Sequence, residues 1–414
     1  MTAADIFTTW SRMVLAWQSG AADQGADPAV PPVCLRHGPQ ALARMASSAG
    51  AQRHRAAARA VSSFLRDDCA ACLILGADAA FASSVLPLLP AHTPVVTIEP
   101  DAQRARAFAA ACPQALLLTE QSPWALFLLL LGLGIAPERA LLCRAPRLGE
   151  EGGDAATAQE SRSEQVFGAL RSLILGARPL AVRQYSGCWP LAVACIIHPD
   201  EPDVASFFRH IPPWVQEVCV VWDTVAPLHV PPCPVPLRQM TRPLHGDFGA
   251  QRNAMLDMVL APWCLYLDAD ERLRPEDWER LPSLMIAAEA GGVGGIALPR
   301  RTYAGRLGAV RMGFGLWPDM QLRLFRTSPA THFCGAINEK VYDYMGAAAF
   351  VADIPLLHYG QALKGQAVLR ERLAECYAAS SHIYSPHSAY PALPEAFFDA
   401  LERQSMAGIL WRLP

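Results

Sequence analysis

The segment HGDFGAQRNAMLDMVLAPWCLYLDADERLRPEDWERL, residues 245–281, decides the fold of the second half of the chain. Its pattern predicts a helix over Gln251–Leu260, followed by a short apolar strand over Trp263–Leu267. The strand stops at an acidic run that begins with Asp268. Because ligands bind at the carboxyl ends of strands in an open α/β sheet, this run marks a candidate site.

The acidic run Asp268-Ala269-Asp270-Glu271 holds three carboxylates in four residues. Such a local negative field suits a hard divalent cation, Mg²⁺ or Mn²⁺, because these ions prefer oxygen ligands. In an extended chain, alternation would place Asp268 and Asp270 on one side. The cation would then neutralise a diphosphate leaving group. The alternative is an acidic loop that caps the following helix, and the acids alone favour that alternative.

Strand and helix patterns elsewhere predict two α/β domains. Leu191–Ile197 and Val218–Trp222 have the pattern of buried strands, with a helix over Pro202–His210 between them. Nearer the N-terminus, a strand–helix–strand pattern that ends at Glu99 is typical of half a doubly wound unit. The strands predicted there are Cys72–Leu75, Val95–Ile98, Ala115–Leu118 and Ala140–Cys143.

We therefore expect an α/β protein with four parts. A smaller doubly wound domain over residues 1–147 precedes a linker over 148–188, where the composition turns to Gly, Ser and acids. The larger α/β domain covers residues 189–360. A helical C-terminal extension covers residues 361–414.

Composition limits the class of protein. With 52% hydrophobic and 18% charged residues the chain can bury a core, which excludes a disordered protein. A net charge of −3 argues against a nucleic-acid partner, because phosphate binding normally needs a basic excess. The 12 cysteines are scattered, and Cys69 and Cys72 lack the second pair that a zinc site needs.

Targeting and membrane signals are also weak. The N-terminal stretch MTAADIFTTWSRMVLAWQSG lacks the basic-then-apolar order of a signal peptide. The longest apolar run, Trp124–Ala136, is too short to cross a bilayer and predicts a core helix. We expect a protein of the cytoplasm.

Seven motifs between Leu191 and Gly360 carry a family resemblance: LAVACIIHPDE, VCVVWD, FGAQRN, YLDADERL, WPDMQLRLFR, FCGAINEKVY and LLHYG. In this order the chain resembles the family 2 glycosyltransferases, in the branch related to lipopolysaccharide-core and glycan-modifying enzymes. The resemblance implies a GT-A fold over residues 189–360. It implies a metal-dependent, usually inverting transferase of the hexosyltransferase type. The donor would be a nucleotide sugar, and the acceptor a glycan, a lipid-linked saccharide or a protein.

Carried over to this sequence, the resemblance assigns residues to the metal and the donor. Asp268 and Asp270 match the DxD carboxylates, and His358 matches a late histidine that completes the metal's ligands. The donor would also contact the helix start at Arg252, where free N–H groups attract phosphate. A surface arginine paired with Asp247 is the alternative for Arg252. The expected donor-binding residues are Glu201, Asp223, Arg252, Asn253, Asp268 and Arg323.

An inverting sugar transfer needs one general base for the acceptor hydroxyl. The resemblance matches Glu339 to the glutamate of the family's His-Glu pair, and Asn338 stands where the histidine is expected. Asp319 is the second candidate, with acceptor or sugar contact as its other role. Arg323 would balance the diphosphate, or pair with Asp319 as part of the structure.

The sequence also departs from the family pattern. The first loop is His198-Pro199-Asp200-Glu201 where the family generally has Asn-Glu, and the proline-rich stretch VWDTVAPLHVPPCPVPL lacks the usual nucleotide-pocket pattern. The identity of the donor is therefore open. The alternative function is a non-catalytic nucleotide-sugar or glycan-binding protein with a degenerate site. Peripheral association with the inner face of the membrane is the alternative to a location in the cytoplasm away from the membrane.

Residues 1–147 resemble the Rossmann-like domains attached to some bacterial glycan-modifying transferases, and more distantly the methyltransferase sheet. Gly76-Ala77-Asp78 offers one glycine where a cofactor-binding turn needs two or three. We expect a structural or partner-docking domain. The alternative is a domain that binds S-adenosylmethionine or a dinucleotide, with Glu99 on the ribose.

Overall fold

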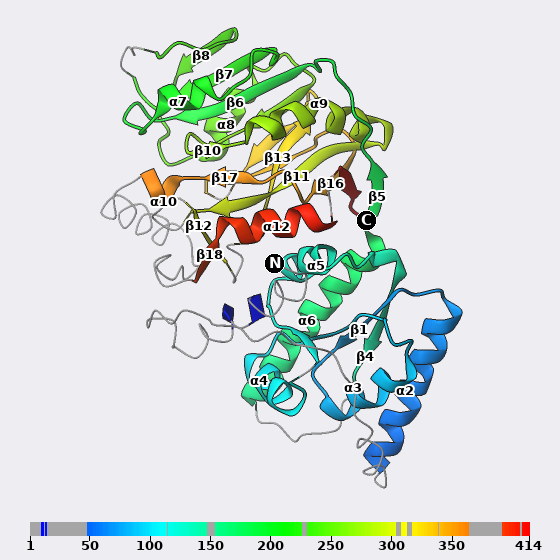
Figure 1. Ribbon diagram of the computed structural model, residues 1–414. Coiled ribbons are helices and arrows are strands. Elements are labelled where there is room, and N and C mark those ends of the chain that lie inside the picture. Colours follow the sequence, from blue (N-terminus) through cyan, green and yellow to red (C-terminus); the bar gives the residue numbers. More distant parts are fainter. Residues whose placement is uncertain are drawn as a thin grey trace. The chain divides into compact units, whose positions relative to one another are not determined.

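The chain forms two compact units, each described here by itself (Figure 1). Unit 1 comprises Met1–Gly176, Gly313–Gly315 and Ala396–Met406, and unit 2 comprises Ala177–Met312, Leu316–Glu395 and Ala407–Pro414. The computed structural model describes residues 10–11, 13–14, 48–113, 115–146, 154–225, 230–303, 308–312, 317–337, 339–363, 391–405 and 408–414.

Unit 1 is built on a parallel sheet whose strands, among the described residues, have the order β3-β2-β1-β4. All four predicted strands are confirmed to within one residue. The order reverses between β1 and β4, and that reversal is where a doubly wound sheet places its crevice. The strands are β1 (Ala71–Leu75), β2 (Val95–Ile98), β3 (Leu116–Leu118) and β4 (Ala140–Arg144).

Capping side chains fix where three helices of unit 1 begin. Asp78, Asp101 and Ser122 each accept a hydrogen bond from the backbone N–H three residues later. α5 is almost entirely buried, which confirms the predicted core helix. The described helices of unit 1 are α2 (Ser48–Arg66), α3 (Ala79–Val85), α4 (Ala102–Ala111), α5 (Pro123–Gly132), α6 (Asp154–Gly176) and, except for its first residue, α12 (Glu395–Ser405), with short 3₁₀ turns at Leu86–Leu88 and Pro137–Arg139.

The predicted linker over residues 148–188 is wrong for most of its length. Residues 154–176 form α6, a helix of 23 residues that belongs to unit 1. The polar composition was misleading because the segment is also rich in Ala, Glu, Gln and Arg, which are strong helix formers. Residues 178–181 of the same segment form β5, a strand of unit 2. Residues 148–153 lie outside the described part of the chain.

Unit 2 is built on a large mixed sheet with the strand order β5-β19-β16-β11-β13-β9-β6-β7-β8 among the described residues. β9, β6, β7 and β8 are parallel, whereas β13 is antiparallel to both β9 and β11. β10 pairs with β17, and β17 pairs in turn with β11. The strands are β5 (Arg178–Ala181), β6 (Leu191–Ile197), β7 (Glu217–Trp222), β8 (Leu237–Thr241), β9 (Trp263–Tyr266), β10 (Glu271–Arg272), β11 (Val293–Thr302), β13 (Asp319–Arg326), β16 (Ala347–Val351), β17 (Leu356–His358) and β19 (Ile409–Arg412).

Helices cover both faces of this sheet. On one face, buried side chains of α9 (Pro275–Ala290) pack with alternate residues of β6, β7 and β9. On the other face, Met255 of α8 (Phe248–Leu256) packs with Tyr266 and with residues of β6 and β7. The remaining elements of unit 2 are α7 (Val204–Arg209), α10 (Gly360–Leu363), the pair β12 (Ala309–Arg311) and β18 (Ala392–Pro394), and the pair β14 (His332–Cys334) and β15 (Lys340–Tyr342).

The expectation of a helical extension over residues 361–414 holds only in part. α12 is helical, but β18 pairs with β12, and β19 lies between β5 and β16 in the main sheet. The sequence ILWR of β19 is short and apolar, so its pairing with β16 supplies a stability that the local pattern could not reveal. Residues 364–390 of this segment lie outside the described residues.

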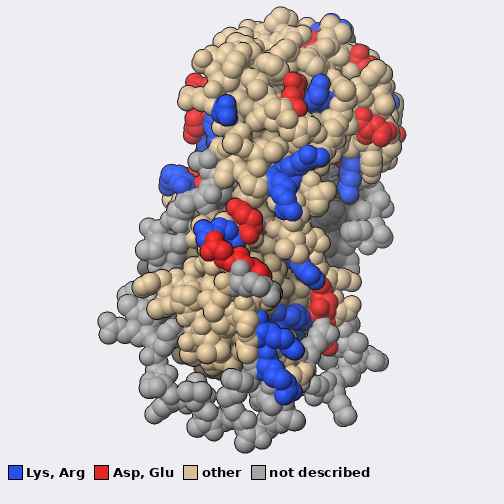
Figure 2. All heavy atoms as spheres, turned by 90° about the vertical axis from the view of Figure 1, so that its right-hand side faces the viewer, with Lys and Arg blue, Asp and Glu red and all other residues tan. Residues whose placement is uncertain are grey.

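The described helices include none that is both long enough and apolar enough to cross a membrane. On the face shown in Figure 2, acidic and basic residues stand in small groups of both signs between larger tan areas. This arrangement agrees with the low share of charged residues, 18% of the chain.

Candidate active site

The acidic run lies in a tight turn at the carboxyl end of β9. The Glu271 N–H donates to the Asp268 carbonyl at 2.9 Å, and the Asp268 N–H donates to the Glu271 carboxylate at 3.0 Å. The chain is therefore turned rather than extended between Asp268 and Asp270. The expectation that alternation places these two carboxylates on one side is corrected, because it assumed an extended chain.

Two arginines hold the Asp268 carboxylate. Arg252 of α8 donates to Oδ1 at 2.7 Å, and Arg323 of β13 donates to Oδ2 at 2.7 Å. Both guanidinium groups lie over the Tyr266 ring, with Cζ 4.7 Å and 4.4 Å from its centroid. Both are almost fully buried. The alternative that placed Arg252 at the surface with Asp247 is wrong, because Asp247 caps α8 instead.

The pairs continue on both sides into one chain of alternating charges. On one side, Arg252 Nε donates to Glu339. On the other, Arg323 donates to the fully buried Glu271 at 2.7 Å, and Arg300 lies 3.4 Å from the same Glu271 oxygen. We call the whole set the charge chain; its members, in spatial order, are Glu339, Arg252, Asp268, Arg323, Glu271, Arg300 and Asp319.

Asp319 closes the far end of the charge chain. Arg300 donates to its Oδ2 through Nε at 2.8 Å and also through Nη2. Gln321 donates to Oδ1 at 2.6 Å. Asp319 therefore pairs with Arg300 and not with Arg323, which corrects the structural alternative considered for Arg323.

Asp270 and His358 converge beside the charge chain. Asp270 Oδ1 lies 3.7 Å from His358 Nε2, and His358 Nδ1 lies 3.1 Å from Thr302 Oγ1. The backbone fixes this arrangement, since β10 and β17 pair Glu271 with His358 and the Tyr359 N–H donates to the Asp270 carbonyl at 2.8 Å. A Cβ on Gly360 would lie 2.7 Å from Asp270 Oδ2 and 2.9 Å from His358 Nε2. Only glycine leaves space beside both groups.

The expected metal set of Asp268, Asp270 and His358 is therefore not brought together. Among the described residues no group of three or more His, Cys, Asp or Glu side chains is arranged to hold a metal ion. Both Asp268 oxygens accept from arginines, which leaves Asp270 and His358 as the two groups that converge. One carboxylate and one imidazole beside an open glycine fit a divalent cation whose other ligands come from a bound anion.

The remaining predicted donor residues lie at the same edge of the sheet. Glu201 follows β6, which pairs with β9, and Asp223 follows β7, which is the next strand beyond β6. Asp223 accepts from the Leu244 N–H at 2.8 Å. Asn253 exchanges two hydrogen bonds with the Phe333 backbone, at 2.9 Å and 2.7 Å. Its amide therefore holds β14 against α8, a structural role that the sequence did not indicate.

Burial and ion pairing act in opposite directions on these charges. Burial raises the pKa of Asp268, but the opposite effect of Arg323 and Arg252 is larger. The pKa of Asp268 therefore lies well below its ordinary value. Burial lowers the pKa of Arg252, but Asp268, followed by Tyr266 and Glu339, raises it by more. The net effect is a pKa of Arg252 above its ordinary value. Burial lowers the pKa of His358 and the Asp270 charge only partly opposes this, so the imidazole is neutral near pH 7, the form that binds metals.

Sequence reasoning missed Arg300, Thr302 and Gly360. Arg300 lies on β11, where the segment LPRRT places two arginines in an otherwise apolar strand. That signal was available, because a charged side chain in a buried strand needs a partner. Thr302 reaches His358 through the pairing of β11 with β17, and Gly360 acts through its lack of a side chain beside Asp270 and His358. Both effects join segments far apart in sequence, which no local pattern reports.

Comparisons with known proteins identify a glycosyltransferase relative. No family model matches the chain. The chain is 27% identical over 158 residues to the lipopolysaccharide core biosynthesis glycosyltransferase LpsC of Rhizobium meliloti (strain 1021). The match covers 36% of this chain and 54% of that protein, so the chain spans about half the length of this relative. The chain is thus homologous to a glycosyltransferase over part of its length.

Among solved structures, the chain has a TM-score of 0.23 to the crystal structure of S. aureus TarS, with 16% identity over 28% of this chain and 22% of that chain. It has a TM-score of 0.23 to S. aureus TarS 1–349 in complex with UDP-GlcNAc, with 16% identity over 28% of this chain and 36% of that chain. Scores at this level do not establish a shared overall fold.

Proposed function

We propose that this protein is a glycosyltransferase that moves a sugar from a nucleotide-sugar donor to a glycan, lipid-linked saccharide or protein acceptor. The partial homology to a glycosyltransferase supports this function. The position of the charge chain supports it as well, because Asp268 at its centre lies directly after β9, one of the parallel strands of the sheet.

The observation that carries the proposal is a pair of unused donor groups. Arg252 Nη1 and Arg323 Nε are buried and have no hydrogen-bond partner among the described residues. A buried N–H without a partner is costly unless a ligand satisfies it. Both groups belong to guanidinium ions that bind Asp268, and guanidinium is suited to phosphate oxygens. We assign them to the diphosphate of the donor.

We assign metal binding to Asp270 and His358, whose side chains converge beside the charge chain. They would hold Mn²⁺ or Mg²⁺, whose charge would offset the charge that develops on the departing diphosphate. Asp268 is assigned to the arginines instead. Its role is to orient Arg252 and Arg323 so that their free N–H groups are fixed before the donor arrives.

We assign the general base to Glu339, with Asp319 as the second candidate. Arg252 occupies Oε1 of Glu339, and Oε2 has no hydrogen bond to a described residue. Both oxygens of Asp319 are occupied, by Arg300 and Gln321. A base must reach the proton it removes, so the carboxylate with a free oxygen is the better candidate. The GT-A fold, the family 2 branch, the inverting outcome and the hexosyl group belong to this proposal too.

One observation favours the second candidate function, a non-catalytic nucleotide-sugar-binding protein. The charge chain satisfies Asp268 within the protein, so the DxD pattern does not present two free carboxylates. Such a protein would still bind a donor through Arg252 and Arg323. It would bind without turnover.

Two measurements separate these functions. Thermal shift with a panel of nucleotide sugars identifies the donor, because a ligand that binds only the folded state raises its melting temperature. Turnover of that donor is then followed with Mn²⁺, with EDTA, and in Asp270→Asn. The proposal expects turnover that EDTA and Asp270→Asn both remove. Binding without turnover would support the binding protein, and full turnover in EDTA would remove the metal from the proposal.

A further inference from the structure

A cavity of about 520 Å³ lies in unit 2 apart from the charge chain. None of the seven charge-chain residues, all of which are described, lines it. Its walls are the segment after β5, the N-terminal half of α9, Trp214, and the ends of β16 and β19. Its volume is within the range of sites that hold a small organic molecule.

Aromatic side chains form one part of the wall. Trp214 is half-buried and stands edge-on to Trp278, with centroids 6.4 Å apart. Tyr185 is 42% exposed and stands edge-on to Trp189, with centroids 6.2 Å apart. The Tyr185 ring covers Gly187 so closely that a Cβ there would lie 2.3 Å from the phenol oxygen. These contacts hold the two wall rings in place.

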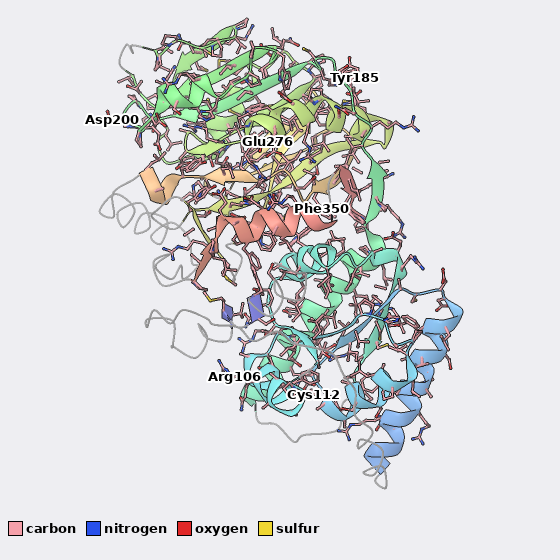
Figure 3. The ribbon with its side chains drawn as sticks, in the orientation of Figure 1. Arg106, Cys112, Tyr185, Asp200, Glu276 and Phe350 are labelled. Carbon is pink, nitrogen blue, oxygen red and sulfur yellow. The ribbon has the colours of Figure 1, made fainter. Side chains whose placement is uncertain are left out.

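One face of α9 forms another part of the wall. Glu276, Glu279, Arg280 and Ser283 line the cavity at the i, i+3, i+4 and i+7 positions of one helix face. Figure 3 labels Glu276 at the start of α9 and Tyr185 on the segment after β5. The Tyr185 N–H donates to Ser283 Oγ at 2.8 Å, which ties the two walls together.

The α9 part of the wall carries a net negative charge at the cavity surface. Arg280 is already paired, with Asp353 Oδ2 at 2.5 Å and with Asp277 at 3.3 Å. Glu276 and Glu279 form no hydrogen bond or ion pair with another residue of the described chain, and both are exposed. The cavity is therefore lined by two carboxylates that have no ion-pair partner among the described residues, together with two aromatic side chains.

We infer that this cavity binds an amine-bearing sugar unit. Carboxylates and aromatic faces both attract an ammonium group. The sugar's apolar ring face would pack on Trp214 or Tyr185, and its hydroxyls would donate to the carboxylates. The volume exceeds the needs of a bare ammonium ion. None of the residues that line the cavity belongs to the charge chain. A failure to bind sugar here would therefore not contradict the proposed function, and a failure of the proposed function would not contradict binding here.

Calorimetric titration of the full chain with D-glucosamine and D-glucose tests the inference. The two sugars share one ring and differ by the charged amine, so they isolate the electrostatic part. We expect saturable, millimolar binding of glucosamine and binding of glucose at least about tenfold weaker. Raising the salt concentration should weaken glucosamine binding, because exposed charges are screened.

Variants locate the site. Glu276→Gln with Glu279→Gln should remove the preference for glucosamine, and Trp214→Ala should weaken both sugars. Glu138→Gln, an exposed glutamate of unit 1, is the matched control and should bind as wild type does. Circular dichroism confirms the fold of each variant. Equal binding of the two sugars, no saturable binding of glucosamine, or an unchanged preference in the double glutamine variant would each overturn the inference.

Discussion

Each unit has a fully buried glutamate near the carboxyl end of a parallel strand, and different partners stabilise the two carboxylates. Glu99 follows β2 in unit 1, and its oxygens accept from the Ala77 and Asp101 N–H groups at 2.9 Å and 3.0 Å. Glu271 begins β10 in unit 2, and it accepts from Arg323 and from the Asp268 N–H. Backbone N–H groups of the neighbouring loop stabilise Glu99, whereas an ion pair with Arg323 makes Glu271 part of the charge chain.

The difference shows that position in an α/β sheet does not by itself make a site. Both glutamates lie at the carboxyl ends of parallel strands, where ligands bind in such folds. In unit 1 the space beside Gly76 is taken by the chain itself, because Arg144 donates to the Leu75 carbonyl at 2.7 Å and lies 2.8 Å from where a Gly76 Cβ would be. In unit 2, Arg252 and Arg323 of the charge chain each keep one N–H without a hydrogen-bond partner among the described residues.

The largest effect expected is on catalysis at the unit 2 site. Glu339→Gln keeps the shape of the side chain but removes its ability to take a proton, so transfer should slow by about 10²–10⁴ while donor affinity stays normal. Asp319→Asn should do less and mainly weaken substrate binding. Transfer rate and donor affinity are measured for both variants. If Asp319→Asn is the inactive variant and Glu339→Gln is near normal, the base is the other carboxylate.

The next effect compares the two buried glutamates directly. Glu271→Ala removes the fully buried carboxylate between Arg323 and Arg300 and leaves them only the half-buried Asp268 and Asp319 as anionic partners. This should cost roughly 3–5 kcal/mol of stability. Glu99→Ala leaves two backbone N–H groups unsatisfied and should cost roughly 1–3 kcal/mol. Urea unfolding, with hydrogen exchange of β1 and β9 amides to separate the units, measures both. A larger cost for Glu99→Ala would reverse our comparison.

A smaller effect is expected at the turn after β1. Gly76 has φ of +100° and Arg144 Nη1 lies where its Cβ would be. Gly76→Ala should therefore cost about 1–2 kcal/mol. Gly134→Ala is the matched control, since its φ is +73° but a Cβ there meets nothing within 4 Å. Equal losses in the two variants would mean that Arg144 moves away freely.

The smallest effect expected is the pH dependence of stability that comes from one carboxyl group in each unit. The pKa shifts of these two groups have opposite signs. Burial raises the pKa of Glu99, so its contribution to stability falls as the pH rises from about 4.3 through the raised value. Arg323 and Arg252 lower the pKa of Asp268, so its contribution is present above about pH 3.9 and falls as the pH drops below that. Carbon NMR titration of both carboxyl groups checks the two directions. Shifts of the same sign would contradict the comparison.

The sequence predicted the local elements of this comparison well and its long-range contacts poorly. Apolar runs such as Leu191–Ile197 and Val95–Ile98 identified strands correctly, because burial on both faces leaves an unambiguous pattern. The helix α6 was missed because polar residues that favour helices also occur in linkers. β19 was missed because its partners lie far away in the chain.

The same division applies to the site. Family motifs pointed to Arg252, Asp268, Arg323 and Glu339, and the structure brings all four into one charge chain. Alternation failed for Asp268 and Asp270 because a turn, set by a hydrogen bond to Glu271, separates them. The pairing of each charge depends on tertiary structure.

The central claim is that turnover takes place on the charge chain at the end of β9 and not in unit 1. Transfer from the donor identified by thermal shift is measured side by side in wild type, Asp268→Asn and Glu99→Gln, with circular dichroism to confirm folding. Asp268→Asn should lose roughly 10²-fold or more, because Arg252 and Arg323 lose the anion that orients them. Glu99→Gln should transfer at the wild-type rate. Normal transfer in a folded Asp268→Asn protein would contradict the account.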